Sequence, residues 1–164
     1  MPRERKMEVS ASVIVHATED PRIVTGAASQ MLGIQEDAFT GTDTTGHFGN
    51  PISVYGVNLT GADAALSVRR FVGMLSGADV DALEAQIQER TVDSRLHLRI
   101  DKQVLIRSGR LEIIGLHGSG GHGGEEGEGG NGGSKDAIKI KIHTPIYSRR
   151  DAVPTFAEIL RGGA

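Results

Sequence analysis

Two stretches in the second half of the chain carry basic side chains at every second position. Residues 96–100 read LHLRI and residues 137–143 read AIKIKIH, so that His97, Arg99, Lys139 and Lys141 alternate with leucine or isoleucine. Alternation with a period of two places such residues on one face of a β-strand. If both strands share a sheet, their cations form a surface that can bind phosphate groups. The residues expected to contact phosphate are Arg99, Lys102, Arg107, Lys139 and Lys141.

The same alternation is also typical of an ordinary solvated sheet face, where lysine and arginine face water by default. Neither stretch contains an aromatic residue. RNA-binding sheets that stack bases on central aromatic side chains are therefore not expected here.

A second candidate lies in residues 46–51, GHFGNP. Glycine and asparagine tolerate positive φ and proline fixes φ, so this segment is expected to form a structured chain reversal. A phenylalanine at its tip could stack on a base while His47 or Asn50 reads a base edge, and we therefore expect base contacts from His47, Phe48 and Asn50. The alternative is a hairpin whose Phe48 folds back onto the core.

Residues 118–134 contain ten glycines in 17 residues and no hydrophobic side chain. Such a composition cannot form a core, and it predicts a disordered insertion within one domain that spans residues 1–164. The nearby His117, His122, Glu125 and Glu126 offer imidazole and carboxylate ligands for a metal, but nothing in the pattern fixes their geometry. The Gly-x4-Gly-Lys-Ser/Thr order of a phosphate-binding loop is absent. We expect neither a metal nor a cofactor.

Catalytic residues are harder to assign. Asp101 and Lys102, with His97 and His143, could form an acid–base set on the sheet. However, the sequence has no nucleophile elbow, zinc-binding helix motif or dinucleotide fingerprint. Scattered carboxylates and histidines on strands are usually surface groups in ion pairs, so the protein is not expected to be an enzyme.

The composition bounds the class of protein. The chain has 164 residues, no cysteine and a net charge of −3. It has no apolar run long enough to span a bilayer, and its first residues are too charged for a signal peptide, so we expect a cytoplasmic protein. Residues 1–94 carry 7 basic and 13 acidic side chains, whereas residues 95–164 carry 11 basic and 8 acidic ones. This asymmetry favours a basic face on an otherwise mildly acidic domain.

The apolar periodicity predicts the elements that position these residues. Strands are expected at residues 7–17, 39–45, 52–60, 96–101, 111–116 and 137–142. Helices are expected at 21–32, from 61 to a break at Gly77, from an Asp79 cap to Arg90 and from about 149 to 160, with a short helical turn or bridge at 102–108. The order β-α-β-β-α-α-β-β-β-α predicts an α+β fold, with an antiparallel or mixed sheet and helices packed on one face.

Three strings taken together resemble one family. They are VSASVIVHATED at 9–20, GHFGNPI at 46–52 and LHLRIDKQ at 96–103, followed by AIKIKI at 137–142. The chain is similar over nearly its whole length to the archaeal RNA-binding family described as predicted exosome subunits. The resemblance implies a two-layer α+β fold like that of the large-subunit ribosomal protein that binds 5S ribosomal RNA, and RNA binding linked to RNA processing or degradation. The 118–134 segment departs from the family, because it is longer and richer in glycine than the short turn expected there.

The motif residues implied by the resemblance are His16, Thr18, Glu19 and Asp20, then residues 46–51, then Asp101, Lys102 and Gln103. We hypothesise that these three motifs meet at one end of the sheet. The leading interpretation is a non-catalytic RNA-binding domain. The alternative is a protein-interaction module that uses its sheet edge or the acidic helix at 79–90, docking on an RNA-processing complex without touching RNA.

Overall fold

The computed structural model describes residues 6–46, 49–117, 136–144 and 151–162. Its elements, in chain order, are β1 (Glu8–His16), α1 (Pro21–Leu32), the 3-10 turn η2 (Glu36–Ala38), β2 (Thr40–Thr45), β3 (Pro51–Thr60), α2 (Gly61–Gly73), α3 (Gly77–Ala85), α4 (Ile87–Arg90), β4 (Thr91–Val92), β5 (Arg95–Asp101), α5 (Lys102–Ser108), β6 (Ala137–His143) and α6 (Ala152–Leu160). The α+β class predicted from the sequence is confirmed.

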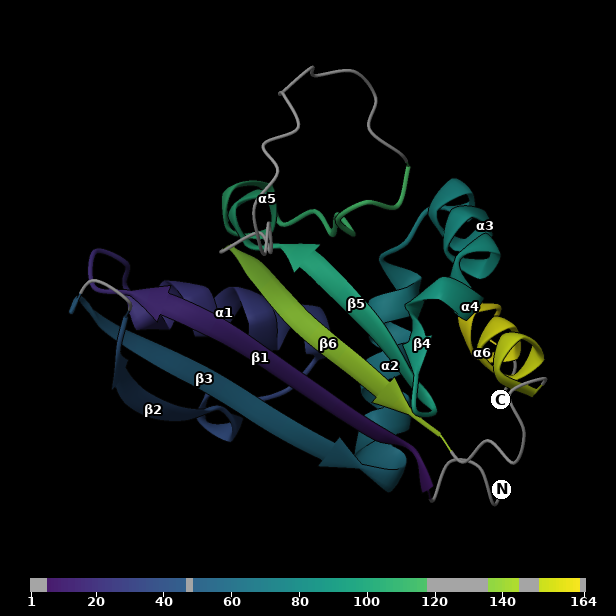
Figure 1. Ribbon diagram of the computed structural model, residues 1–164, viewed down its shortest axis with the longest axis horizontal. Coiled ribbons are helices and arrows are strands. Elements are labelled where there is room, and N and C mark those ends of the chain that lie inside the picture. The colour runs from purple at the N-terminus through teal and green to yellow at the C-terminus, as the bar shows by residue number, and fades with distance from the viewer. Residues whose placement is uncertain (1–5, 47–48, 118–135, 145–150, 163–164) are drawn as a thin grey trace.

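The strands form one six-stranded sheet in the order β2-β3-β1-β6-β5-β4, and every pairing is antiparallel (Figure 1). β1 lies inside the sheet, where it pairs with β3 through Ala11↔Val57 and with β6 through Ala11↔Ile140. The N-terminal strand therefore joins the β2–β3 hairpin to the later β5–β6 pair.

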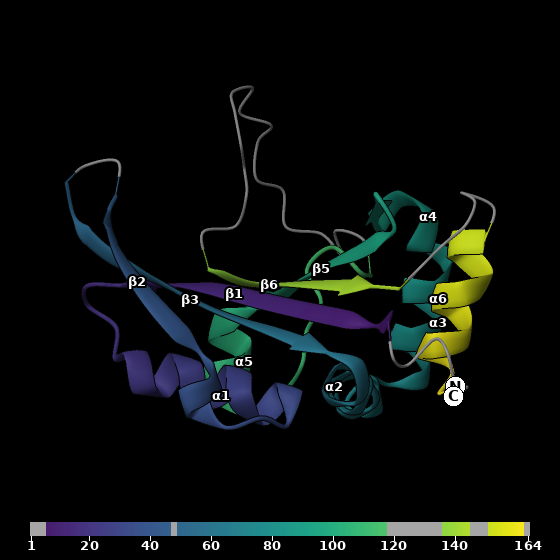
Figure 2. The same ribbon diagram turned by 90° about the horizontal axis from the view of Figure 1, so that it is seen from below.

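Helices α1, α2 and α5 cover one face of this sheet, as the edge-on view shows (Figure 2). α3, α4 and α6 pack on one another near β5. We call the sheet face turned away from α1 and α2 the open face. Its side chains remain half-buried or exposed, as at Ser10, Ser12, Lys139 and Lys141.

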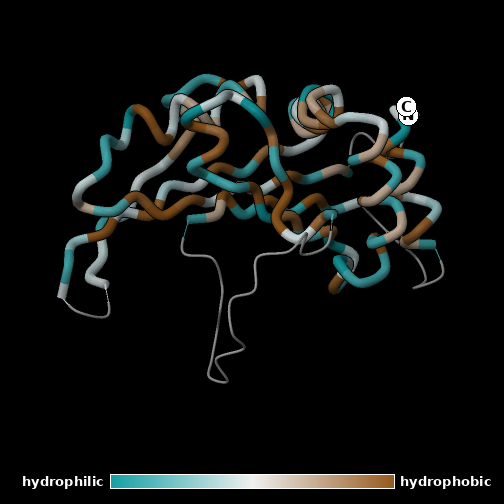
Figure 3. The backbone as a smooth tube through the Cα atoms, turned by 90° about the horizontal axis from the view of Figure 1, so that it is seen from above, coloured by the Kyte–Doolittle hydropathy of each residue, from teal (hydrophilic) through white to brown (hydrophobic). Residues whose placement is uncertain are grey.

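The core follows the period-two pattern of the strands. The helix-facing positions of three of the four inner strands are buried, and hydrophobic residues are brown in Figure 3. They are Val9, Ala11, Val13 and Val15 on β1, Ile138, Ile140 and Ile142 on β6, and Leu96, Leu98 and Ile100 on β5. Because the alternation is strict, the opposite positions of the same strands necessarily line the open face.

Local signals fix the ends of the first helix as expected. The Asp20 side chain accepts a hydrogen bond from the Arg22 amide, Pro21 opens the helix, and Gly33 ends it at φ 68°. The prediction for the acidic helix was wrong in two respects. Ser76, not Asp79, is the N-cap of α3, and Asp79 completes a capping box three residues on. This helix also ends at Ala85, with Gln86 as its C-cap, and α4 follows as a separate turn.

Other boundaries differ from the sequence prediction. Residues 111–116 form no strand, because only Ile113 bridges to Ile100 and Gly115 turns the chain at φ 77°. The short β4 and η2 had too few residues to show a period. The last helix begins at Ala152, and the expected residues 149–150 lie outside the described residues, as does the 118–134 segment.

Candidate nucleic-acid interface

The open face carries its basic residues on β5 and β6, directly opposite one another. His97 pairs in register with Lys141, and Arg99 pairs with Lys139. Arg99 and Lys139 are like charges on directly opposed positions, an arrangement that destabilises a sheet. Within the described part of the chain, neither Lys139 nor Lys141 has an ion-pair partner. The charges of Lys139 and Lys141 are therefore not compensated by an ion pair within the described residues.

The pKa of His97 is affected by the positive charges of this strand pair. Its pKa is lowered from the ordinary value of 6.5, first by burial and then by the positive charges of Lys141 and Arg95. A cation is thus disfavoured at this position by its surroundings. An anion placed on the face would reverse that effect.

Arg95 extends the basic strip by one more open-face position, opposite His143. The sequence analysis did not include Arg95, although its position two residues before His97 places it on the same face of the strand. We define the basic strip as five of the open-face residues of β5 and β6: Arg95, His97, Arg99, Lys139 and Lys141.

Lys102 does not belong to this strip. Its side chain is fully buried, and its Nζ donates to the backbone oxygen of Ile14 at 3.0 Å and to Oε1 of Glu19 at 2.8 Å. It also lies 3.3 Å from Oδ1 of Asp136. The expectation that Lys102 contacts phosphate is corrected on this ground, since a buried and paired ammonium group is not accessible to an external phosphate.

Arg107 is also separate from the strip. It is exposed in the last turn of α5, and that helix packs beside α1 on the covered side of the sheet (Figure 2). A ligand that lies on the open face would not reach it. Of the five expected phosphate contacts, the structure brings together Arg99, Lys139 and Lys141.

The three motif regions meet at one end of the sheet. His16 at the end of β1 is paired with Ile52 at the start of β3, and its Nε2 lies 3.3 Å from Oδ1 of Asp136. Asp101 at the end of β5 is paired with Ala137. Figure 1 shows the ends of β1 and β5 on the same side of the molecule. The convergence that the sequence suggested is present in the described residues.

The reversal itself is only partly described. Thr45 pairs with Pro51, and the Gly46 amide donates to the Asn50 oxygen at 2.7 Å, which closes the expected hairpin. Asn50 is exposed. His47 and Phe48 lie outside the described residues, so their expected base contacts stay a prediction.

A possible metal cluster was missed by the sequence analysis. His16, Glu19 and Asp136 bring one ligand atom each within 4.8 Å of one another. Imidazole and carboxylate suit a transition metal. However, Oε1 of Glu19 and Oδ1 of Asp136, the atoms nearest His16, are the same atoms that Lys102 approaches. The ammonium group already supplies the positive charge there, so the residues fit an ion-pair network better than a metal.

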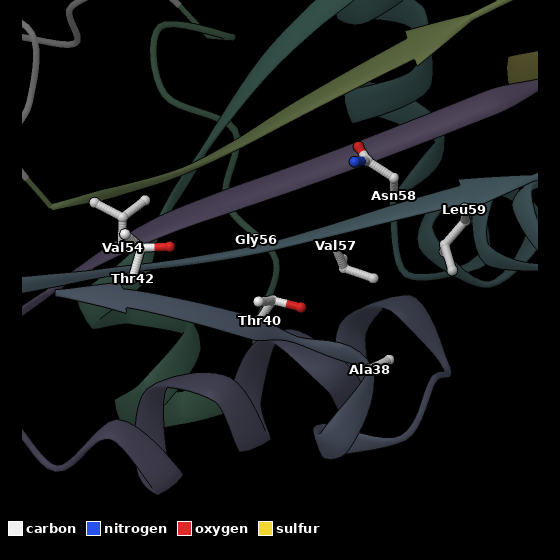
Figure 4. A pocket seen from close by; sticks show the side chains of 8 residues that line it. All are labelled: Ala38, Thr40, Thr42, Val54, Gly56, Val57, Asn58 and Leu59. Atoms are coloured by element: carbon white, nitrogen blue, oxygen red, sulfur yellow. The ribbon is translucent and has the colours of Figure 1, made fainter.

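A hollow lies at the β2–β3 hairpin, lined by residues of β3, β2 and the preceding turn (Figure 4). β2 begins opposite Gly56, and β3 continues past it. Figure 4 shows Asn58 pointing to one side of β3 and Val57 and Leu59 to the other. The hollow therefore wraps around the free edge of β3. It contains no titratable side chain, which argues against acid–base chemistry there.

A protein-family model described as RNA binding matches residues 8–144. The uncharacterized protein MJ0213 of Methanocaldococcus jannaschii is 30% identical over 101 residues, which are 58% of this chain and 68% of that protein.

Solved structures share the fold. Mth689, a DUF54 protein from Methanothermobacter thermautotrophicus, superposes with a TM-score of 0.64 at 24% identity, over 93% of this chain and 96% of its own. A UPF0201 protein from Methanococcus jannaschii gives a TM-score of 0.56 at 12% identity, over 93% and 91% of the two chains. Among the helices of the described residues, none has the length and apolar character of a membrane span.

Proposed function

The chain belongs to the family whose model is described as RNA binding, and from this membership we propose that it binds RNA directly on the open face of its sheet. The observation that supports this site is the basic strip, in which His97 faces Lys141 and Arg99 faces Lys139. Arg99 and Lys139 are like charges on opposed positions, which weaken a sheet, and a bound polyanion would compensate them.

The proposed mechanism is neutralisation of phosphates, without catalysis. Lys139 and Lys141 are exposed and able to follow a phosphate backbone. Arg99 is half-buried beside them. If about four phosphates are neutralised, the slope of log K against log salt concentration is about −3. Asn50 and the neighbouring His47 and Phe48 remain the proposed base contacts.

Fluorescence anisotropy with a labelled RNA at two salt concentrations tests the proposal. We expect salt-sensitive binding by the wild type and its loss in the double variant Lys139→Glu/Lys141→Glu. A matched control is Arg107→Glu, which changes one exposed charge on the covered side of the sheet. Equal losses in the control and the double variant would contradict the assignment to the open face. A folded wild-type protein that fails to bind at low salt would overturn direct RNA binding.

The finer proposal is a role in RNA processing or degradation, in association with the exosome, inside the cytoplasm. It is supported by the resemblance of residues 9–20, 46–52 and 96–103 to that family. Purification of the tagged protein from an archaeal cell, followed by mass spectrometry with and without ribonuclease, tests this. Exosome subunits that remain after ribonuclease treatment would support a protein contact, and their absence in both samples would contradict the association.

A second candidate function is protein docking, which one observation favours. The outer side of α1, α2 and α5 encloses a groove in which Ile23 is 56% and Met74 37% exposed. The acidic helix is less suited to docking than the sequence suggested. Asp81 and Glu84 both form ion pairs with Arg161, and Oδ1 of Asp79 lies 2.6 Å from Nε2 of His117.

A further inference from the structure

The middle of the open face carries unusually small side chains next to the basic strip. On β1, Ser10 is in register with Lys141 and Ser12 with Lys139. On β3, Gly56 is in register with Ser12. We call Ser10, Ser12 and Gly56 the trough. Their small side chains allow a ligand to approach the sheet backbone more closely than it can over the lysines.

The hydroxyl group of Thr40 borders the trough on its far side, because the exposed Thr40 of β2 is in register with Gly56. The exposed Thr42 and Thr44 continue this row towards the hairpin, opposite Val54 and Ile52. Neighbouring strands lie about 4.8 Å apart, so roughly 14 Å separates the lysines of β6 from the threonines of β2. That width is sufficient for one sugar–phosphate backbone to lie between a positive wall and a hydroxyl wall.

Base stacking has no platform on the described open face. Tyr55 is the aromatic residue nearest to the trough, but it pairs with the buried Val13 and packs over Gly41, so it belongs to the covered side. Proteins that bind single strands without sequence preference rely on stacking as well as charge. A face that offers charge and hydroxyls without rings is better suited to a nucleic acid whose bases are already paired.

Ser10 and Ser12 supply the remaining chemistry. Both are half-buried, and within the described part of the chain neither hydroxyl has a hydrogen-bond partner. A serine hydroxyl can donate to and accept from a ribose 2′-hydroxyl. In A-form duplexes these 2′-hydroxyls line a wide and shallow minor groove, which proteins read by shape.

Resting on the RNA-binding function proposed above, we propose that the open face binds duplex RNA through its backbone and, apart from the base contacts proposed at residues 47–50, with little dependence on base sequence. The basic strip holds the phosphates of one strand. The trough admits the ribose edge, where Ser10 and Ser12 bond 2′-hydroxyls. This arrangement distinguishes RNA from DNA through those hydroxyls and a duplex from a single strand through shape.

The test compares three probes of about 16 base pairs or nucleotides and the same sequence: duplex RNA, duplex DNA and single-stranded RNA. We expect duplex RNA to bind at least about tenfold more tightly than either other probe. DNA lacks the 2′-hydroxyls that Ser10 and Ser12 would bond, and each lost hydrogen bond lowers the affinity about fivefold. In the double variant Ser10→Ala/Ser12→Ala, the preference for RNA over DNA should largely disappear while the salt dependence is unchanged.

Gly56→Leu tests the shape of the trough. A Cβ at Gly56 meets only the Ala11 oxygen at 3.6 Å, an ordinary contact, so the variant should fold. We expect it to lose at least about tenfold in affinity for duplex RNA because the added side chain fills the trough. The matched control is Gly73→Leu, which adds the same side chain on exposed α2, where nothing lies within 4 Å. Circular dichroism checks that both variants fold.

The outcomes separate this inference from the function on which it rests. Equal binding of duplex and single-stranded RNA, or of duplex RNA and duplex DNA, overturns the inference and leaves RNA binding in place. A folded Gly56→Leu variant with wild-type affinity removes the trough from the site. Should Gly56→Leu fail to fold, the serine double variant decides alone. Failure of the wild type to bind any of the three probes overturns both proposals.

Discussion

Nζ of Lys102 lies 2.8 Å from Oε1 of Glu19, a contact that joins residues 83 positions apart in the chain. The lysine is the first residue of α5, and the glutamate is in the turn between β1 and α1. With no exposed surface on Lys102, the pair fixes the end of β5 against the end of β1. This contact holds together the sheet end at which the motif residues converge.

Replacing Lys102 with methionine should therefore destabilise the protein. The substitution keeps the length of the side chain but leaves the Glu19 carboxylate without its buried cation. Loss of one partner from a buried ion pair costs about 3 kcal/mol. The measurement is the free energy of unfolding from urea titration followed by circular dichroism.

Two further variants make that measurement specific. Arg107→Met, an exposed position on the same helix, should change the free energy of unfolding by less than about 0.5 kcal/mol. Lys102→Met/Glu19→Gln should lose less than the sum of its single changes, because the two residues interact. Strict additivity would show that the Lys102–Glu19 contact contributes nothing to stability.

Acid should remove the contribution of Glu19. Burial alone would raise the pKa of Glu19. The hydrogen bonds from the Lys102 ammonium and the His16 backbone amide, together with the charges of the Lys102 and His16 side chains, outweigh it, and the pKa falls below 4.5. A carboxylate with a lowered pKa in the folded state stabilises the protein above its unfolded pKa, and that stability is lost as pH falls through the folded value.

The difference in unfolding free energy between the wild type and Glu19→Gln should therefore be largest above pH 4.5 and should shrink below it. Urea titrations of both proteins on either side of this value provide the measurement. A difference that stays constant across the range would show that Glu19 has the same pKa in the folded and unfolded states.

The strands and the open face were predictable because they depend on local periodicity. Val9 to Val15 and Ile138 to Ile142 alternate strictly, which determines the buried side whatever the strand order. The role of Lys102 was not predictable in this way. Its sequence neighbours indicate only a cation at the end of a strand. The pairing of β5 with β6 brings Asp136 to its ammonium group, and the pairing of β6 with β1 brings Glu19 there.

The trough could not be predicted from the sequence either. Ser10, Ser12 and Gly56 lie in separate stretches, and each is unremarkable by itself. The register Ser12↔Gly56 places them together, and register over such distances is set by tertiary packing. Arg107 illustrates the opposite error, because its closeness in sequence to β5 did not place it on the sheet face.

Substitution of Gly41 should be costly, unlike that of Gly56. A Cβ at Gly41 would lie 2.7 Å from Cε1 of Tyr55, so the ring must move away from its packed position on the covered side. Overpacking of this kind costs about 1–3 kcal/mol. We expect Gly41→Val to lower the thermal midpoint by several degrees, and Gly41→Val/Tyr55→Leu to recover part of it. No recovery would indicate that the ring is not the cause.

The ionisation of His97 should respond to RNA. Its pKa is held below 6.5 by burial, by Lys141 and by Arg95. Phosphates bound on the basic strip would oppose the repulsion and raise this pKa, so that binding takes up a proton. Affinity for RNA should then increase as pH falls through the region just below 6.5.

Ring signals of His97 in an NMR pH titration measure this directly. In free protein, Lys141→Gln should raise the pKa of His97 towards 6.5 by removing one repulsive charge, whereas Arg107→Gln should leave it unchanged. Addition of duplex RNA to the wild type should raise the His97 pKa further than the Lys141→Gln change does, since several phosphates approach the strip at once. A His97 titration that is identical with and without saturating RNA would place the bound RNA away from β5 and β6, because a phosphate within reach of Lys141 also lies near its cross-strand partner His97.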